Sequence, residues 1–316
     1  MQNESKPELV AAKTAQAKNL ADIDKWTYAH GEWKIGEGKL TQSNNKGITR
    51  TFQNINDSDY IAVFKMRLSQ TNPEMPGEAK FIYSDADKNE DYRIDFMYGF
   101  GVCRVTAGKF QFNTILELVY EKEYLIKISV KDNLLTIYVD GMRIVYNYGF
   151  GKRSNGFVGL GSWTASVEFW DIDIRPFQQT KCFIIMPFDE KRNLLYDYVI
   201  KPALDKHPTF IFDYKRADEA LTVGRISEEI TEYINTADVL IADITSTNAN
   251  VFYELGYAHA KLCKALLLIE EVKGVKLTIP FDIQDFRCHT YIFSKEGFES
   301  ICEKISSVLT NIAGEN

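Results

Sequence analysis

One carboxylate stands out because it interrupts an apolar helix pattern. Residues 248–260 read NANVFYELGYAHA, in which Glu254 lies about one turn inside a predicted helix that follows the strand-like run VLIADIT. A carboxylate at such a place can act as a nucleophile or stabilise a developing positive charge, and Asp243 at the preceding strand end is predicted to support it. The alternative is an acid that complements the helix dipole, a contribution of about 0.3–1 kcal/mol.

Further candidate site residues follow the predicted strands of the same region. They are Met186, Pro187, Phe188 and Arg192 after the first strand, Arg216, Asp218 and Arg225 after the second, and Asn248 and Asn250 beyond Asp243. The carboxyl ends of parallel strands meet at one edge of a sheet, so we predict one ligand site whose arginines hold phosphate groups. The sequence has no P-loop, dinucleotide fingerprint or His/Cys cluster, so we predict neither a metal nor a bound cofactor.

The elements that carry these residues alternate between strands and helices from about residue 180 onward. Apolar runs such as CFIIMPF, VLIADI and ALLLIEE are separated by segments with helical periodicity, for example VGRISEEITEYINTA. In the helix of Glu254, the predicted buried stripe consists of Val251, Leu255, Ala258 and Leu262. Strands that are apolar on both faces predict a parallel sheet covered by helices on both sides. We therefore predict a flavodoxin-like, doubly wound α/β domain over residues 179–316.

In the first half of the chain, apolar residues alternate with polar ones, a spacing that differs from the helical periodicity of the second half. From Trp26 to Phe177, short alternating runs are punctuated by Gly, Asn and Asp, and the run LLTIYVDGMRIVYNY places Asp140 and Gly141 between two apolar segments. This pair predicts a tight hairpin, because its turn needs positive φ at both residues. Many short strands without an intervening helix predict an all-β jelly-roll sandwich over residues 22–178, preceded by an N-terminal arm over 1–21.

Composition limits the classes of function and partner. The formal net charge of -7 and the pI near 5.3 argue against binding to bulk nucleic acid or to an anionic membrane. No apolar run has the length of a signal core or a membrane span. The five cysteines, Cys103, Cys182, Cys263, Cys288 and Cys302, are scattered, which favours reduced thiols and a cytoplasmic location. A homo-oligomer is left open by the sequence.

Both halves resemble known families. W-x6-W-x4-G-x-L at the start, Y-V-D-G in the hairpin and G-x-V-G-L near the end resemble concanavalin A-like sandwiches of the laminin G and keto-disaccharide-hydrolase type. The segments FIIMPF, RADE, ISEEITEYINTADVLIADIT and NANVFYELGYAHA resemble the nucleoside 2-deoxyribosyltransferase-like group and the neighbouring TIR-like NAD-cleaving domains. The second resemblance implies that Glu254 and Asp243 are catalytic. It also implies that Phe188, Arg216 and Asp218 border the base.

The residues and the resemblance together predict an N-glycosidase that cleaves the base–sugar bond of a nucleotide. NAD is the predicted substrate, because nicotinamide leaves as a neutral molecule and needs no protonating acid. In this interpretation the sandwich is the recognition or assembly module of a defence or signalling effector. The alternatives are a non-catalytic nucleotide-sensing module, a glycosidase or transferase acting on (deoxy)nucleoside monophosphates, and a sandwich that binds a carbohydrate or protein ligand and so directs the second domain.

Overall fold

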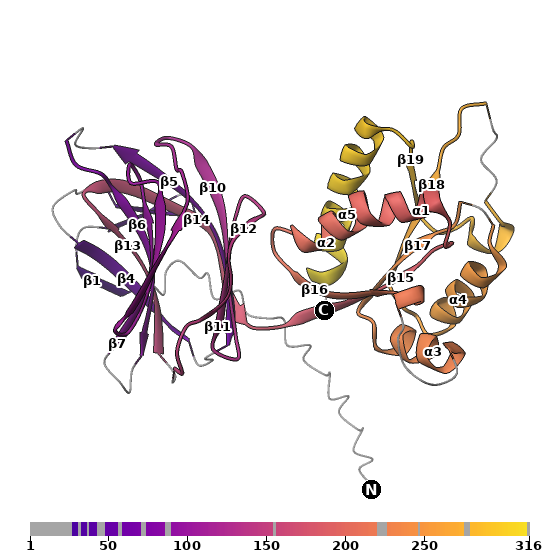
Figure 1. The fold of residues 1–316 in the computed structure, drawn as a ribbon, viewed down its shortest axis with the longest axis horizontal. Coiled ribbons are helices and arrows are strands. Elements are labelled where there is room, and N and C mark those ends of the chain that lie inside the picture. Colours follow the sequence, from indigo (N-terminus) through magenta and orange to yellow (C-terminus); the bar gives the residue numbers. More distant parts are fainter. Residues whose placement is uncertain are drawn as a thin grey trace, which may run out of the picture.

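The computed structural model describes most of the 316-residue chain. The described residues are 27–30, 33–36, 38–42, 48–55, 59–70, 74–85, 90–153, 156–219, 226–245, 247–274 and 279–314. Two seven-stranded sheets come first, and a five-stranded sheet with helices follows (Figure 1). The predicted N-terminal arm lies outside the described residues.

The two larger sheets form a sandwich. Sheet A contains, in spatial order, β1 (Thr27–His30), β4 (Ile48–Ile55), β13 (Gly156–Trp163), β6 (Glu78–Asp85), β7 (Glu90–Met97), β8 (Val102–Ala107) and β9 (Phe110–Ile115). Sheet B contains β12 (Met142–Gly149), β11 (Leu134–Val139), β10 (Glu123–Lys131), β5 (Tyr60–Gln70), β14 (Ala165–Pro176), β3 (Lys39–Gln42) and β2 (Trp33–Gly36). All neighbouring strands in both sheets are antiparallel, so the predicted sandwich is confirmed.

Side chains that alternate along each strand build the core of the sandwich. In β6, Ala79, Phe81 and Tyr83 point between the two sheets. Phe81 stacks on Phe64 of β5 with ring centroids 5.9 Å apart, and Tyr83 stacks on Tyr60 at 5.7 Å. Such aromatic pairs add about 0.5–1.5 kcal/mol beyond the area that they bury. The other residues of β6 must therefore lie on the outer face of sheet A, because successive side chains point to opposite faces.

The hairpin between β11 and β12 has the predicted turn. Val139 pairs with Met142, which leaves Asp140 and Gly141 as the two residues of the loop. Their φ angles are 48° and 76°, the left-handed values that a type I′ turn requires at both positions. Local sequence alone therefore predicts this turn correctly.

The third sheet, sheet C, is parallel. Its strands, in spatial order, are β16 (Ile211–Arg216), β15 (Gln179–Ile185), β17 (Val239–Asp243), β18 (Ala265–Glu270) and β19 (Cys288–Tyr291). The helical elements are α1 (Glu190–Leu195), η2 (Tyr196–Ile200), α2 (Lys201–Asp205), η3 (Ala217–Glu219), α3 (Ile226–Thr236), α4 (Ala249–Ala260), η4 (Phe281–Ile283) and α5 (Lys295–Gly314). The parallel sheet and its helices are compatible with the predicted α/β class.

Both faces of sheet C are buried under helices. On one face Ile184, Ile241 and Leu268 belong to a cluster with residues of α1, η2, α2 and α5. On the other face Leu240 and Ala242 belong to a cluster with residues of α3 and α4. Figure 1 shows these two sets of helices on opposite sides of the sheet. Burial on both faces explains why the strands read as continuous apolar runs in the sequence.

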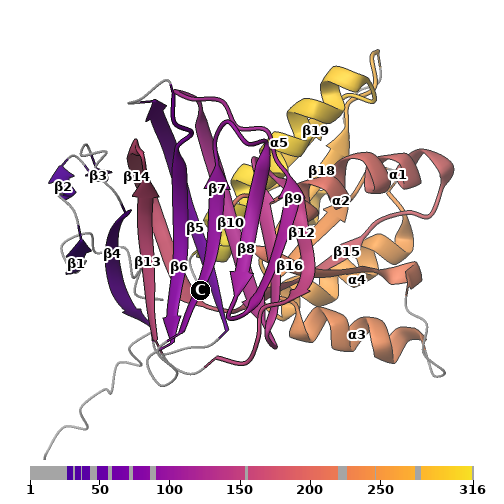
Figure 2. The ribbon, with the colours of Figure 1, turned by 60° about the vertical axis from the view of Figure 1, so that its left-hand side comes forward.

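Sheet B contacts the loop that precedes β16. Lys127 of β10 donates to the carbonyls of His207 and Phe210 at 2.6 and 3.3 Å, and Arg175 of β14 donates to the carbonyl of Thr209 at 2.8 Å. Burial lowers the pKa of Lys127 to about 8. The outer face of sheet B is therefore partly covered, whereas sheet A lies on the side of the sandwich away from sheet C (Figures 1 and 2).

His207 connects the same loop to α5. Its Nδ1 accepts from the backbone N–H groups of Thr209 and Phe210, at 3.2 and 3.0 Å. An accepting Nδ1 means that the proton is on Nε2, which lies 3.1 Å from the carbonyl of Ser306. Burial lowers the pKa of His207 to about 4, so the ring is neutral at pH 7 and acts as a structural connector.

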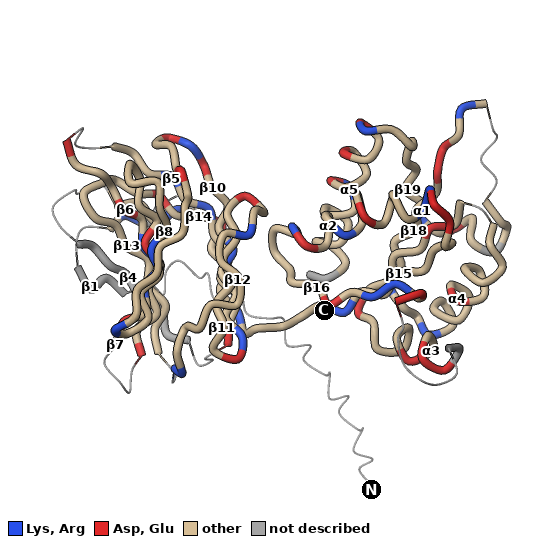
Figure 3. Tube along the Cα trace, viewed as in Figure 1, with Lys and Arg blue, Asp and Glu red and all other residues tan. Residues whose placement is uncertain are grey.

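Charged residues of both signs are spread over the sandwich and the parallel sheet (Figure 3). Within the described ranges, no cluster of three or more His, Cys, Asp or Glu side chains is arranged to hold a metal ion. None of the helices in those ranges combines the length and the apolar composition that crossing a membrane requires.

Candidate functional site

The carboxyl edge of sheet C gathers a network of buried charges around Asp243. The Tyr291 hydroxyl donates to Asp243 Oδ2 at 2.6 Å, and the backbone N–H of Thr245 donates to Oδ1 at 2.9 Å. Arg192 Nε lies 3.9 Å from the same Oδ2. The Asp243 side chain is fully buried. Asp243 therefore links the ends of β17 and β19 to α1, and both of its oxygens are already in use.

Arg192 is held by a second carboxylate. Its Nη2 lies 3.2 Å from Glu270 Oε2, while Lys191 pairs with the other oxygen of Glu270. The Arg192 guanidinium is buried and faces two anions, Glu270 and Asp243. Two bases and two acids thus balance at this edge. Arg192 is thus paired with two protein carboxylates, while its Nε has no hydrogen-bond partner among the described residues, and its role in holding a phosphate stays a prediction.

The residues after β16 pair with one another. Arg216 donates to both carboxylate oxygens of Asp218, at 2.6 and 2.5 Å, and to Asn193 Oδ1 at 2.8 Å. Its guanidinium carbon lies 5.7 Å from the ring centre of Phe188, whose side chain is exposed. The structure therefore brings Phe188, Arg216 and Asp218 together. Arg216 is buried and bidentate to Asp218, and its role in binding a phosphate stays a prediction.

Glu254 lies on α4, separate from the Asp243 network. Asn248 caps this helix, because its Oδ1 accepts from the N–H groups of Asn250 and Val251 at 2.9 and 3.3 Å. No hydrogen bond or ion pair joins Glu254 to Asp243 or to any other residue in the described part of the chain. Burial raises the pKa of Glu254 to about 7. The predicted support of Glu254 by Asp243 is therefore not observed.

The remaining predicted residues divide between buried and exposed positions. Met186 and Pro187 are buried beneath the edge, and Asn250 is exposed at the start of α4. Arg225 lies outside the described residues. Sequence reasoning missed Glu270 and Tyr291, which belong to the fourth and fifth strands of the sheet. The sequence could have indicated them, because ligands bind at the carboxyl ends of parallel strands and this holds for the fourth and fifth strands as well as for the first three.

A second group of charged residues lies on the outer face of sheet A. Lys80 of β6 contacts Glu78 on the same strand and Asp95 on β7, the latter at 3.0 Å from Nζ to Oδ1. All three side chains are at most 6% exposed, although the sandwich core lies on the opposite face of these strands. Charged side chains are almost never buried unless they are paired, and this triad is paired on the face that points away from the core.

The strand register places aromatic and glycine positions beside this triad. Trp163 of β13 pairs with Glu78, and Gly161 pairs with Lys80. No side chain projects from Gly161, or from Gly159 two residues before it. Trp163 is partly exposed. The outer face of sheet A therefore combines hydrogen-bonding charges, an indole ring and a stretch of bare backbone within neighbouring strands, a combination typical of sites that fix a polar ligand by few polar groups and an aromatic surface.

Comparison with known proteins finds likeness in structure alone. No family model matches the chain, and no curated protein matches it significantly. Three similar solved structures are the carbohydrate-binding module CBM66 from Bacillus subtilis, a Bacillus subtilis protein of unknown function with a galectin-like fold, and a prokaryotic β-1,3-1,4-glucanase (lichenase) derived from a mouse hindgut metagenome. Their identities are 16%, 11% and 14%, and their TM-scores are 0.42, 0.38 and 0.37.

These matches cover about half of this chain. The shares of this chain are 48%, 49% and 48%, and the shares of the other chains are 95%, 90% and 92%. The similar structures are galectin-like and concanavalin A-like sandwiches, which agrees with the first of the two predicted resemblances. Nothing in the comparisons shows a nucleoside deoxyribosyltransferase-like or TIR-like second half.

The predicted function is corrected accordingly. The names of the similar structures concern carbohydrate binding and glycan processing, and they include a sialidase and a putative glycosyl hydrolase. None of them supports the predicted N-glycosidase acting on NAD, its nucleotide-sensing and nucleoside monophosphate alternatives, or a nucleotide partner, so these predictions are withdrawn. The geometry gives a physical reason, since the buried guanidinium groups of Arg192 and Arg216 are neutralised by protein carboxylates.

Proposed function

We propose that the chain binds a carbohydrate on the outer face of sheet A. The observation that carries this proposal is the buried Glu78, Lys80 and Asp95 triad on the face of the sandwich that points away from the core. Burying charges is costly, and a buried ion pair is weak evidence for stability. A ligand that hydrogen-bonds to these groups would account for the buried charges, which a contribution to stability does not.

The triad matches the chemistry of sugar hydroxyls. Each ionised carboxylate has about four lone-pair positions, and an ammonium has three donors. Lys80 uses its donors on Glu78 and Asp95, so both carboxylates retain acceptor positions for hydroxyl groups of a ligand. Hydrogen bonds to charged groups contribute about 1.5–3 kcal/mol each. The triad therefore supports binding of neighbouring hydroxyls on one sugar ring.

Trp163 and the bare backbone of β13 supply the apolar part of the proposed site. The indole of Trp163 lies next to Glu78 in the strand register, and Gly161 lies next to Lys80. A sugar ring has a face of C–H groups, which an aromatic ring contacts favourably while the ring hydroxyls reach polar groups at its edge.

We infer binding without hydrolysis. Glycosidases use a pair of carboxylates of which one donates a proton and the other attacks or activates water. Glu78 and Asp95 are such a pair by residue type, but both contact the ammonium of Lys80. Because both carboxylates contact the same cation, neither is set apart as the proton donor, and this favours a binding site over a catalytic one. Release of reducing sugar from a bound glycan would reverse this part of the proposal.

A glycan array with the full chain tests the proposal. We expect selective binding to a small set of glycans, and Trp163→Ala is expected to weaken the affinity by at least about tenfold through loss of the stacking surface. Trp170→Ala is the matched control, because Trp170 lies on the outer face of sheet B and contacts Lys39. Absence of binding to any glycan, or equal loss of binding in both variants at unchanged folding, would count against the proposal.

For sheet C we propose the flavodoxin-like variety of the α/β class. The support is its spatial strand order, β16-β15-β17-β18-β19, in which the first strand in the chain lies second. Glu254, Asp243 and the strand-end residues around them remain a predicted site at this edge, without an assigned ligand. We also propose that residues 22–178 and 179–316 are separate domains, since each contains its own buried clusters.

A further inference from the structure

The outermost strand of sheet C has a free edge. β19 pairs with β18 on one side, and within the described ranges no strand pairs with its other side. Alternate backbone N–H and C=O groups of such a strand point outward without a partner strand. A cavity of about 860 Å³ opens along this edge, which is within the size range of ligand sites.

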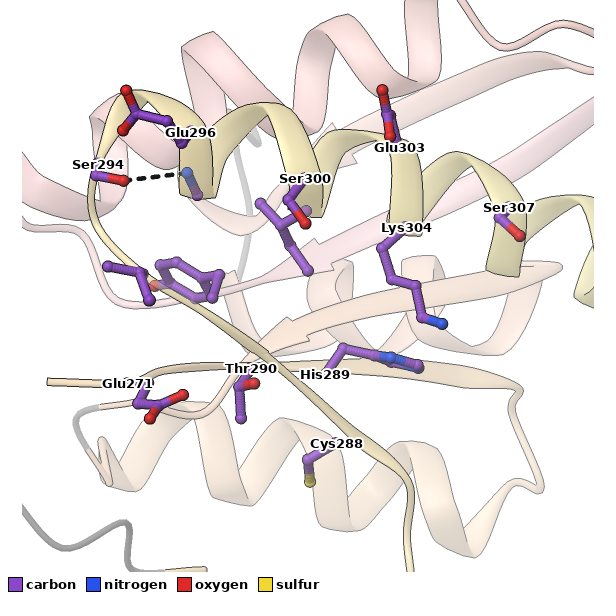
Figure 4. Close-up of a pocket in the computed structure, with 14 residues that line it drawn as sticks. Glu271, Cys288, His289, Thr290, Ser294, Glu296, Ser300, Glu303, Lys304 and Ser307 are labelled. Carbon is purple, nitrogen blue, oxygen red and sulfur yellow. Dashed lines mark hydrogen bonds between the residues drawn. The ribbon is translucent and has the colours of Figure 1, made fainter.

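Strand and helix together form the walls of this cavity. Residues from both faces of β19 line it, among them Cys288 and His289, which shows that the cavity wraps around the strand edge. The residues of α5 that line it recur every three or four positions and include Gly297, Ser300, Ile301, Lys304 and Ser307. Figure 4 shows the groove between β19 and α5 that results. We call it the β19–α5 groove.

The charges in the β19–α5 groove are polarised along the strand. Lys304 supplies the positive charge at the end where β19 begins and lies toward His289 (Figure 4). Burial, together with the nearby Lys304 and Arg287, lowers the pKa of His289, so its ring is neutral at pH 7 and can offer a hydrogen bond. Neither Lys304 nor His289 has a hydrogen bond or ion pair with another residue in the described part of the chain. Glu271 and Glu296 lie at the opposite end, where β19 finishes, and the N–H of Glu271 donates to the carbonyl of Tyr291. The groove is thus basic at one end and acidic at the other.

We propose that the β19–α5 groove binds an extended peptide as an additional strand, antiparallel to β19, with the peptide's C-terminal carboxylate between His289 and Lys304. The basic end lies at the start of β19, so a carboxylate placed there fixes the antiparallel direction. The positively charged end of the peptide then lies near Glu271 and Glu296. Strand addition at an exposed edge gains affinity from backbone hydrogen bonds and specificity from alternate side chains.

An extended peptide fits this groove better than a second copy of the chain. In a second copy, β19 is flanked by its own α5, which would meet the α5 of the first copy at the groove. A peptide strand carries no such helix and needs only the width between β19 and α5. The four residues of β19 span about 13 Å at roughly 3.3 Å per residue, enough to order four or five residues of a ligand.

Peptides displayed with free C-termini are the probe for this proposal. A library of about seven random residues is selected against the full chain, and enriched peptides are synthesised with free and with amidated C-termini. We expect amidation and Lys304→Gln each to weaken binding by at least about tenfold. Glu299→Gln is the matched control, because Glu299 lies on α5, is exposed, and does not line the groove. The affinity of this control variant for the selected peptides is expected to equal that of the wild type.

N-methylation of the peptide tests the strand itself without altering the protein. Methyl groups on one alternate set of peptide nitrogens should abolish binding, and those on the other set should be tolerated, because only every second N–H faces β19. The proposal is overturned by any of three results: no peptide enriched over the Lys304→Gln protein, equal binding of amidated peptides, or tolerance of both N-methylated sets. Dimerisation of the chain that Lys304→Gln abolishes would assign the groove to a second copy instead and would also overturn it.

Discussion

Replacing Lys80 by methionine should destabilise the sandwich strongly. The Lys80 ammonium contacts two carboxylates, those of Glu78 and Asp95, and all three side chains are at most 6% exposed. Lys80→Met leaves two buried anions beside each other without a cation, a change that costs about 3–5 kcal/mol. For a domain of roughly 150 residues, each kcal/mol lowers Tm by about 2–4 °C. We therefore expect Tm to fall by about 6–20 °C.

Replacing the whole triad should have a different outcome. The combination Glu78→Leu, Lys80→Met and Asp95→Leu removes the charges together and substitutes apolar side chains of similar volume. Replacement of a complete buried ion-pair group in this way is neutral or stabilising by about 1–4 kcal/mol. The triple variant is therefore expected to melt at or above the wild-type temperature. A single substitution that destabilises and a triple substitution that does not would show that the triad is dispensable for folding.

Tryptophan fluorescence is the assay for both variants. Trp33, Trp163 and Trp170 lie on strands of the sandwich, and the sequence has no tryptophan after residue 170, so the emission reports on the sandwich. A Lys80→Met protein whose Tm stays within one or two degrees of the wild type would refute the reasoning, because it would mean that the carboxylates do not depend on this cation. A triple variant as unstable as Lys80→Met would show that the charges are structural.

Three further predictions concern sheet C and its contact with the sandwich. Burial raises the pKa of Glu254 to about 7, so the unfolded chain loses this proton first and stability falls as the pH rises from about 4.5 to 7. In urea unfolding, Glu254→Gln should therefore gain about 1 kcal/mol of stability relative to wild type between pH 5 and 8, a value reduced for the partial solvation of the side chain. Stability curves of the two proteins that run parallel over this pH range would contradict the prediction. The pKa of Lys127 is lowered to about 8 by burial, so the folded chain loses this proton first and stability rises between about pH 8 and 10.5, by up to about 3 kcal/mol. Lys127→Met should abolish that rise, and a rise of the same size in the variant would exclude Lys127 as its source. Residues 22–178 and 179–316, expressed separately, should each show cooperative unfolding, whereas two unfolded products would mean a shared core.

Local patterns in the sequence were sufficient for much of the fold. Asp140 and Gly141 predict their turn because the left-handed backbone that both adopt is needed wherever two antiparallel strands are joined by two residues. The apolar run at Val239 to Asp243 predicts a strand buried on both faces, and β17 is one. These features depend on neighbouring residues and on the period of the element alone.

Helix ends and long-range pairings were harder to predict. Leu262 continues the apolar stripe of α4 in the sequence, but the helix ends at Ala260 and Leu262 is 90% exposed with a φ of 59°. The partner of Arg192 was missed because Glu270 lies almost eighty residues away, on a strand whose end was not considered. Pairing of this kind depends on which strands become neighbours, and a single sequence does not reveal it.

The triad on sheet A was missed for a related reason. Glu78 and Lys80 are two residues apart and read as ordinary solvated charges on a strand. Asp95 comes to Lys80 only through the register of β6 and β7, in which these two residues are paired. Their burial depends further on the neighbouring strands of the sheet, including β13 with Trp163. Nothing in the local pattern distinguishes such a group from a polar outer face.

Calorimetric titration of an array-selected glycan into the wild type and the folded triple variant tests the central claim most directly. If the outer face of sheet A binds the glycan through Glu78, Lys80 and Asp95, the wild type gives a saturable heat of binding and the triple variant, with its Tm intact, gives none. Equal affinity of both proteins would contradict the account, because it would place the glycan elsewhere on the molecule.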